Sequence, residues 1–227
     1  MWCATLNQPP TIQAQFEKIL SSDERSRANR FRFEDGRRHF IAGRGFLRML
    51  LGRYLHTAPE HIQFAYTTNG KPFLASQEHI QDIHFNISHS HILALYAFVQ
   101  HREIGVDIEY MRAFSDADAI VDRFFSGQEQ RVFHALPVEK QAEAFYAGWT
   151  RKEAYLKASG DGLTVPLSQF EVSLTPDEAA RILAIEGDVH KATEWFLHDI
   201  AVPNTTYKAA VVLRSNRQWQ IKHWLYE

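Results

Sequence analysis

Apolar side chains recur at helical spacing in two long stretches of the sequence. In residues 37 to 55 they stand three or four positions apart, with arginines on the other side. A second stretch covers residues 140 to 158 and ends before Gly160 and Gly162, which are typical helix stops. Each stretch is predicted to form a long amphipathic helix that buries one face.

Shorter apolar runs between turn residues predict strands. The predicted strands cover residues 85–87, 92–99, 104–109, 170–174, 192–200, 207–213 and 219–225. Each half of the chain thus has a long helix followed by several strands. This order predicts an α+β protein of two similar lobes, residues 1–104 and 105–227, each a long helix packed on a small, mainly antiparallel sheet.

Local signals mark where helices and turns begin. Three Ser or Thr residues precede a Glu by three positions, the spacing of a capping box at a helix start. The pairs are Ser21–Glu24, Thr57–Glu60 and Ser126–Glu129. The run Asn69-Gly70-Lys71-Pro72 predicts a turn.

Composition narrows the class of protein. Of the 227 residues 45% are hydrophobic, enough for a substantial core, and the formal net charge of -2 provides no general attraction to nucleic acid. Nine arginines between Arg25 and Arg53 form a local exception, most of them expected on a solvated helix face. Cys3 is the single cysteine, and neither a signal peptide nor a membrane span is recognisable. We expect a cytoplasmic protein.

The run Ile104-Gly105-Val106-Asp107-Ile108-Glu109 places two carboxylates on one face of a strand. Because side chains alternate along a strand, the apolar residues face the core and Asp107 and Glu109 share the opposite face with Gly105, which would leave room for a ligand. Two adjacent carboxylates favour a divalent cation such as Mg²⁺. A half-exposed edge strand is the simpler interpretation of this run alone.

A second polar group lies on the second long helix. Trp149, Glu153 and Lys157 are spaced by four and form one stripe. A Glu–Lys pair of this kind is ordinarily a surface ion pair, but the Trp indicates that the stripe faces the protein body or a cleft.

The segment from Phe85 to His91 and the turn at Lys71 are compatible with phosphate binding. The hydroxyls of Ser88 and Ser90 alternate with the imidazoles of His89 and His91. Zinc is disfavoured because no cysteine or HExxH motif is close.

Taken together and in order, these motifs resemble the Sfp-type 4'-phosphopantetheinyl transferases. The series is NGKP, FNISHS, GVDIE, FFS and WTRKEAYLKASGDGL, and it extends from the arginine-rich helix to about Pro166. The resemblance implies a pseudo-twofold pair of α+β lobes with the active site between them. It also implies that the N-terminal lobe holds the nucleotide end of coenzyme A and the C-terminal lobe the metal and the catalytic helix.

The resemblance also assigns roles to single residues. Asp107, Glu109 and Glu153 would bind Mg²⁺, with Mn²⁺ as a possible substitute, and Glu153 and Lys157 would be catalytic. The residues implied for coenzyme A binding are Arg38 or Arg44, Lys71, Pro72, Ser88, His89, Lys152 and Lys157. Lys152 and Lys157 would face the pyrophosphate.

The implied reaction transfers 4'-phosphopantetheine from coenzyme A to a serine of an acyl or peptidyl carrier protein and releases adenosine 3',5'-bisphosphate. The carrier would dock between residues 114 and 138, and the enzyme would be a monomer with no nucleic-acid or membrane partner. Two alternatives stay open: a Mg²⁺-dependent nucleotide hydrolase or nucleotidyltransferase, and a non-catalytic carrier-binding protein.

Overall fold

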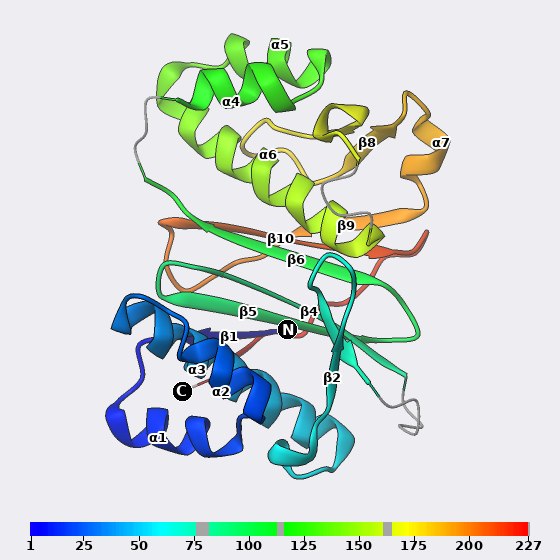
Figure 1. Cartoon of the computed structure of the whole chain (residues 1–227). Coiled ribbons are helices and arrows are strands. Elements are labelled where there is room, and N and C mark those ends of the chain that lie inside the picture. The colour runs from blue at the N-terminus through cyan, green and yellow to red at the C-terminus, as the bar shows by residue number, and fades with distance from the viewer. Residues whose placement is uncertain (76–81, 113–115, 161–164, 227) are drawn as a thin grey trace.

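Two helix layers enclose two sheets in the computed structural model, which describes residues 1–75, 82–112, 116–160 and 165–226. The helices are α1 (Pro10–Ile19), α2 (Ser22–Ala28), α3 (Glu34–Leu55), α4 (Ala117–Phe124), α5 (Gly127–Ala135), α6 (Val138–Ser159) and α7 (Val189–Ala192). Figure 1 shows α1–α3 below the strands and α4–α6 above them. The α+β class predicted from the sequence is confirmed.

Strands of the first sheet run in the order β11-β1-β5-β4, and those of the second in the order β6-β10-β9. Their bounds are β1 (Trp2–Thr5), β4 (Ile83–Ser90), β5 (Leu93–Gln100), β6 (Ile104–Tyr110), β9 (Trp195–Asp199), β10 (Tyr207–Arg214) and β11 (Trp224–Tyr226). Two small hairpins pair β2 (Phe64–Tyr66) with β3 (Pro72–Leu74) and β7 (Phe170–Val172) with β8 (Ile182–Ile185). Short 3-10 turns lie at Pro59–His61 and Leu167–Gln169.

Alternation along the strands explains the layers. In β5, Ala94 and Tyr96 pack with α3, whereas Leu95 and Ala97 face the second sheet. In β10, Ala210 and Val212 likewise pack with α6, and the odd-numbered neighbours face the first sheet. Burial of both faces of each sheet yields three apolar cores stacked between the outer helices.

The predicted long helices are confirmed, and so are two capping boxes. Ser21–Glu24 opens α2 and Ser126–Glu129 opens α5, with both reciprocal hydrogen bonds present. The Thr57–Glu60 pair does not cap, because Ala58 is the N-cap of the turn at Pro59–His61. Helix α6 ends at Gly160, whose φ of 79° is the left-handed conformation that glycine tolerates. Gly162 lies outside the described residues.

Two predicted strands differ from the structure. The segment 192–200 begins as the end of α7 and becomes β9 only at Trp195. Of the segment 219–225, only the last residues join a strand, β11, which runs parallel to β1. Short segments with weak periodicity, such as β1 and β11, take their structure from the neighbouring strand rather than from their own pattern.

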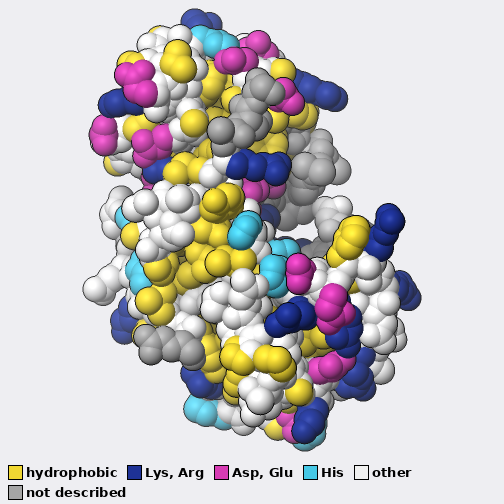
Figure 2. Space-filling view, turned by 90° about the vertical axis from the view of Figure 1, so that its left-hand side faces the viewer, with side chains coloured by type: hydrophobic (Ala, Val, Ile, Leu, Met, Phe, Trp, Pro, Cys, Tyr) yellow, Lys and Arg dark blue, Asp and Glu magenta, His cyan; other side chains and the backbone are white. Residues whose placement is uncertain are grey.

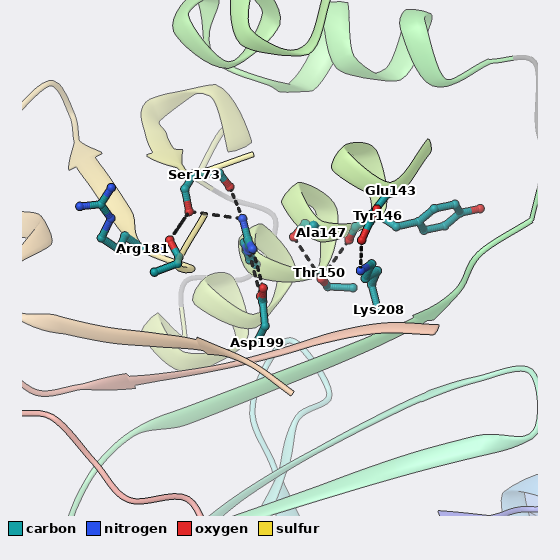
Figure 3. Close-up of polar contacts among 10 residues, drawn as sticks. Glu143, Tyr146, Ala147, Thr150, Ser173, Arg181, Asp199 and Lys208 are labelled. Atoms are coloured by element: carbon teal, nitrogen blue, oxygen red, sulfur yellow. Dashed lines mark hydrogen bonds and ion pairs between the residues drawn. The ribbon is translucent and has the colours of Figure 1, made fainter. Parts of the chain in front are cut away.

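Helix α6 is fastened to the second sheet by polar contacts outside the site. Glu143 pairs with Lys208 of β10 at 2.5 Å, and Arg151 pairs with Asp199 of β9 (Figure 3). Ser173 accepts from the same arginine. The two ion pairs fix the rotation of α6, which sets the direction of its remaining faces. No helix in the described part of the chain is long and apolar enough to cross a membrane.

Candidate active site

Strand β6 carries its two carboxylates on the face that meets α6, as the alternation predicted. Ile104, Val106 and Ile108 are buried in the core between the sheets. The prediction that Gly105 leaves room for a ligand is wrong. A Cβ there would stand 2.1 Å from the carbonyl oxygen of Ala154, so the glycine leaves room for the backbone of α6.

Asp107 is the most deeply buried acid of the site, with 4% of its surface exposed. Its Oδ1 accepts hydrogen bonds from Ser88 Oγ at 2.8 Å and Lys157 Nζ at 2.6 Å. Burial raises the pKa of Asp107, although the charge of Lys157 works against the shift. Its Oδ2 is buried and has no hydrogen-bond partner among the described residues.

Helix α6 brings Glu153 and Lys157 to the same place. Trp149 of this stripe packs against Phe124 and Phe145, so the stripe faces the protein body as expected. Burial raises the pKa of Glu153, and the charges of Asp107 and Glu109 raise it further. The three carboxyls of β6 and α6 are therefore close enough to interact.

Glu109 is half-buried beside Asp107. Burial and the charge of Asp107 raise the pKa of Glu109. Its Oε2 accepts a hydrogen bond from Ser90 Oγ at 2.9 Å. Carboxylates that share a site and resist ionisation gain most from a cation placed among them.

The donor set suits a hard divalent cation, although the acids do not form a closed cage. No group of three or more His, Cys, Asp or Glu among the described residues has the geometry of a formed metal site. Mg²⁺ commonly uses only one or two carboxylates and takes further oxygens from water and phosphate. The buried, unpaired Oδ2 of Asp107 fits this mode of binding.

Lys152 does not face the site, and that prediction is corrected. Its side chain is fully buried on another face of α6, paired with Glu129 at 2.8 Å. It also donates to the carbonyl oxygens of Leu167 and Phe170. Because residues five apart on a helix point in clearly different directions, Lys152 and Lys157 cannot share one ligand here.

A cavity of about 610 Å³ is lined in part by Ser88 and Ser90, the serines that donate to Asp107 and Glu109. Its walls include four of the residues predicted to bind coenzyme A, and His39 and His91 join them. The four are Arg44, Pro72, Ser88 and His89. Figure 2 shows histidine side chains gathered around a hollow at mid-height on this face. Partial burial and the charge of Lys157 lower the pKa of His89.

The two candidate arginines differ in position. Arg44 lines the cavity, donates to Tyr66 Oη at 2.9 Å, and has a buried Nη1 without a hydrogen-bond partner among the described residues. Arg38 instead donates to the carbonyl of Gln8 and borders a separate hollow.

Lys71 connects the predicted turn to α6 rather than lining the cavity. Its Nζ donates to the carbonyl oxygen of Lys157 at 2.7 Å, and Glu103 lies 3.8 Å away. Gly70, with φ of 78°, makes the turn that delivers it. Of the predicted carrier contact at residues 114–138, positions 114 and 115 lie outside the described residues and the rest contains α4 and α5. That contact stays a prediction.

Sequence reasoning assigned no individual role to Asn86, Ser90 and His91, although their segment was judged compatible with phosphate binding. Asn86 Oδ1 accepts from the backbone N–H of Val106 at 2.8 Å, and Ser90 holds Glu109. His91 lines the cavity and stacks on Tyr110. The period-two spacing of Asn86, Ser88 and Ser90 was the available signal, since it places all three on one strand face.

Two family profiles match the chain and define its class. One is described as the 4'-phosphopantetheinyl transferase superfamily and matches residues 103–212. The other is described as 4'-phosphopantetheinyl transferase, N-terminal, and matches residues 8–100. The chain belongs to the Sfp-type 4'-phosphopantetheinyl transferase family, and it is an enzyme of that class.

Individual relatives agree. The 4'-phosphopantetheinyl transferase HetI of a Nostoc species is 41% identical over 100% of this chain and 91% of that protein. The 4'-phosphopantetheinyl transferase Sfp of Bacillus subtilis is 32% identical over 72% of this chain and 70% of its own length. Among solved structures, Thermotoga maritima holo-[acyl-carrier-protein] synthase is 18% identical with a TM-score of 0.40, covering 51% of this chain and 64% of that one.

Proposed function

We propose that this protein transfers 4'-phosphopantetheine from coenzyme A to a serine of an acyl or peptidyl carrier protein, releasing adenosine 3',5'-bisphosphate. The observation that carries the proposal is the meeting of Asp107 and Glu109 of β6 with Glu153 and Lys157 of α6. The acids of β6 are hydrogen-bonded to Ser88 and Ser90, which line a cavity of about 610 Å³. A cavity of this size beside a cation-binding set of acids suits a nucleotide diphosphate.

Asp107, Glu109 and Glu153 would hold Mg²⁺ or Mn²⁺. A bound cation would neutralise the negative charge that grows on the diphosphate as the phosphorus–oxygen bond breaks. The unpaired Oδ2 of Asp107 and the raised pKa values of all three carboxyls support this assignment.

The residues of the chain then have separate tasks in the transfer. Lys157 Nζ, held 2.6 Å from Asp107, provides a fixed positive charge toward the leaving bisphosphate. Glu153, which α6 brings beside Asp107, would accept the proton of the attacking serine, directly or through water. Arg44, Pro72, Ser88 and His89 would orient the nucleotide end of the coenzyme.

We also propose that the molecule is a pseudo-twofold pair of lobes, residues 1–104 and 105–227, that works as a cytoplasmic monomer with the carrier as its macromolecular partner. Support comes from the like placement of α3 on β5 and α6 on β10. The final strand, β11, returns from the second lobe to the first sheet. The free, buried thiol of Cys3 fits a reducing compartment.

The mass of an apo carrier protein incubated with enzyme, coenzyme A and Mg²⁺ tests the function. The proposal expects the carrier to gain the mass of phosphopantetheine, and Asp107→Ala to lose this activity. Hydrolysed coenzyme with an unmodified carrier would instead favour the nucleotide hydrolase. Coenzyme binding that ignores Mg²⁺, without turnover, would favour a non-catalytic carrier-binding protein.

A further inference from the structure

Side chains, rather than a backbone ladder, join the two sheets at the site. β4 is an edge of the first sheet and β6 an edge of the second. Asn86, Ser88 and Ser90 alternate along β4, and each is hydrogen-bonded to β6. The polar face of β4 therefore sets the position of β6, the strand that carries Asp107 and Glu109.

Ser90 is held by β6 from two directions. Its Oγ accepts a hydrogen bond from the backbone N–H of Tyr110 at 3.0 Å and donates to Glu109 Oε2 at 2.9 Å. A serine hydroxyl has one proton to donate. Because the rigid backbone of β6 fixes the oxygen, that proton is directed at the carboxylate.

The hydrogen bond from Ser90 matters more to Glu109 than either single hydrogen bond matters to Asp107. Asp107 is short, buried, and held by both Ser88 and Lys157. Glu109 has a longer side chain, is half-buried, and receives its side-chain hydrogen bond from Ser90 in the described part of the structure. A long carboxylate without a partner keeps several rotamers, and ordering it opposes ligand binding.

We propose that Ser90 is a positioning residue that pre-orients Glu109 for the divalent cation. It acts through Glu109 and the strand, without contacting the reacting atoms. The inference rests on the proposed function, in which Glu109 is a cation ligand. Hydrogen bonds behind a metal ligand typically change metal affinity by about 10- to 100-fold.

The test measures Mn²⁺ affinity by electron paramagnetic resonance on the full chain, without coenzyme or carrier. Ser90→Ala is expected to weaken Mn²⁺ binding by about tenfold or more. Ser90→Thr keeps the hydroxyl and should stay close to the parent protein. Ser90→Cys keeps the size but donates weakly, so it should weaken binding as well.

A double variant separates positioning from general damage. If Ser90 acts through Glu109, then Ser90→Ala should weaken Mn²⁺ binding little further once Glu109→Gln is present. Ser173→Ala is the matched control, because Ser173 is also a buried serine with several hydrogen bonds, which join it to Arg151, Ala179 and Arg181 (Figure 3). It should lower Tm and leave Mn²⁺ affinity at the parent value.

The outcomes distinguish the positioning role of Ser90 from the role of Glu109 as a cation ligand. Unchanged affinity in Ser90→Ala together with weakened affinity in Glu109→Gln overturns the positioning role and leaves the proposed function standing. Unchanged affinity in both variants overturns the role of Glu109 as a ligand, and the positioning role with it. A lowered Tm with parent affinity in every Ser90 variant shows a purely structural serine and also overturns the inference.

Discussion

Glu153 shows how a single residue can oppose stability while serving the reaction. Burial and the charges of Asp107 and Glu109 raise the pKa of its carboxyl, so folding disfavours the ionised form. A carboxyl with a raised folded pKa stabilises the fold below its unfolded pKa, and that contribution is lost as the pH rises through the folded pKa.

We therefore expect Glu153→Gln to raise the Tm of the cation-free protein at pH 8. A gain of about 1 kcal/mol corresponds to roughly 2–4 °C for a chain of this size. Near pH 4, where the carboxyl of the unfolded chain is itself largely protonated, the gain should shrink. Thermal unfolding at the two pH values checks this, and transfer should fall by about a hundredfold or more. An unchanged or lowered Tm at pH 8 would contradict the prediction.

Lys152 and Lys157 provide a matched pair of residues with different roles. Lys152→Ala leaves Glu129 buried without its counter-ion, which costs about 3–5 kcal/mol of folding free energy. Lys157→Ala should instead lower kcat by about 100-fold or more with a smaller effect on coenzyme affinity. Chemical denaturation and steady-state kinetics of both variants distinguish them. Loss of coenzyme binding in a stably folded Lys152→Ala protein would reinstate its predicted contact with the pyrophosphate.

At the scale of elements, the site depends on the direct packing of α6 on β6. The backbone of α6 at Ala154 passes so close to Gly105 that no side chain fits between them. Glu153 and Lys157 therefore reach Asp107 only while the helix lies at this distance. A small change in helix position would separate the acids without altering any of them.

Gly105→Ala tests this dependence. The added Cβ would stand 2.1 Å from Ala154 O, so the helix must shift, which costs about 1–3 kcal/mol of stability. Mn²⁺ affinity and transfer should both fall. Gly127→Ala is the control, since its Cβ would meet nothing nearer than 3.9 Å. Parent affinity for Mn²⁺ in Gly105→Ala would show that the acids do not depend on this contact.

At the scale of the whole molecule, the two ends of the chain are joined at the edge of the first sheet opposite β4. β11 pairs with β1. The rings of Trp224 and Trp2 stack with their centroids 5.1 Å apart, and the ring centroids of Tyr226 and Phe46 of α3 are 4.8 Å apart. This contact forms one edge of the first sheet, and Tyr226 packs against the apolar core that this sheet shares with α3. It contributes to stability rather than to the chemistry.

Tyr226→Ala should accordingly lower stability and spare the chemistry. Loss of a half-buried aromatic ring and its two ring contacts is expected to cost about 2 kcal/mol, or roughly 4–8 °C in Tm. Transfer measured well below Tm should keep its kcat. A large drop in kcat at a temperature where the variant is folded would mean that β11 also supports the site.

The sequence by itself determined what depends on local periodicity. Alternation placed Asp107 and Glu109 together, helical spacing placed Glu153 and Lys157 together, and capping pairs marked the starts of α2 and α5. The motif series identified the family because it contains both groups of acids in order. These properties are set within a few residues, where backbone geometry alone decides which side chains share a face.

Only the tertiary structure decided which element each face meets. It buried Lys152 against Glu129, filled the space at Gly105 with a helix, returned the last strand to the first sheet, and set Ser90 behind Glu109. Each of these contacts joins residues at least 19 positions apart, from Ser90 and Glu109 at 19 to Trp2 and Trp224 at more than 200. Local pattern states only that a face is polar or apolar, and the packing of distant segments selects its partner.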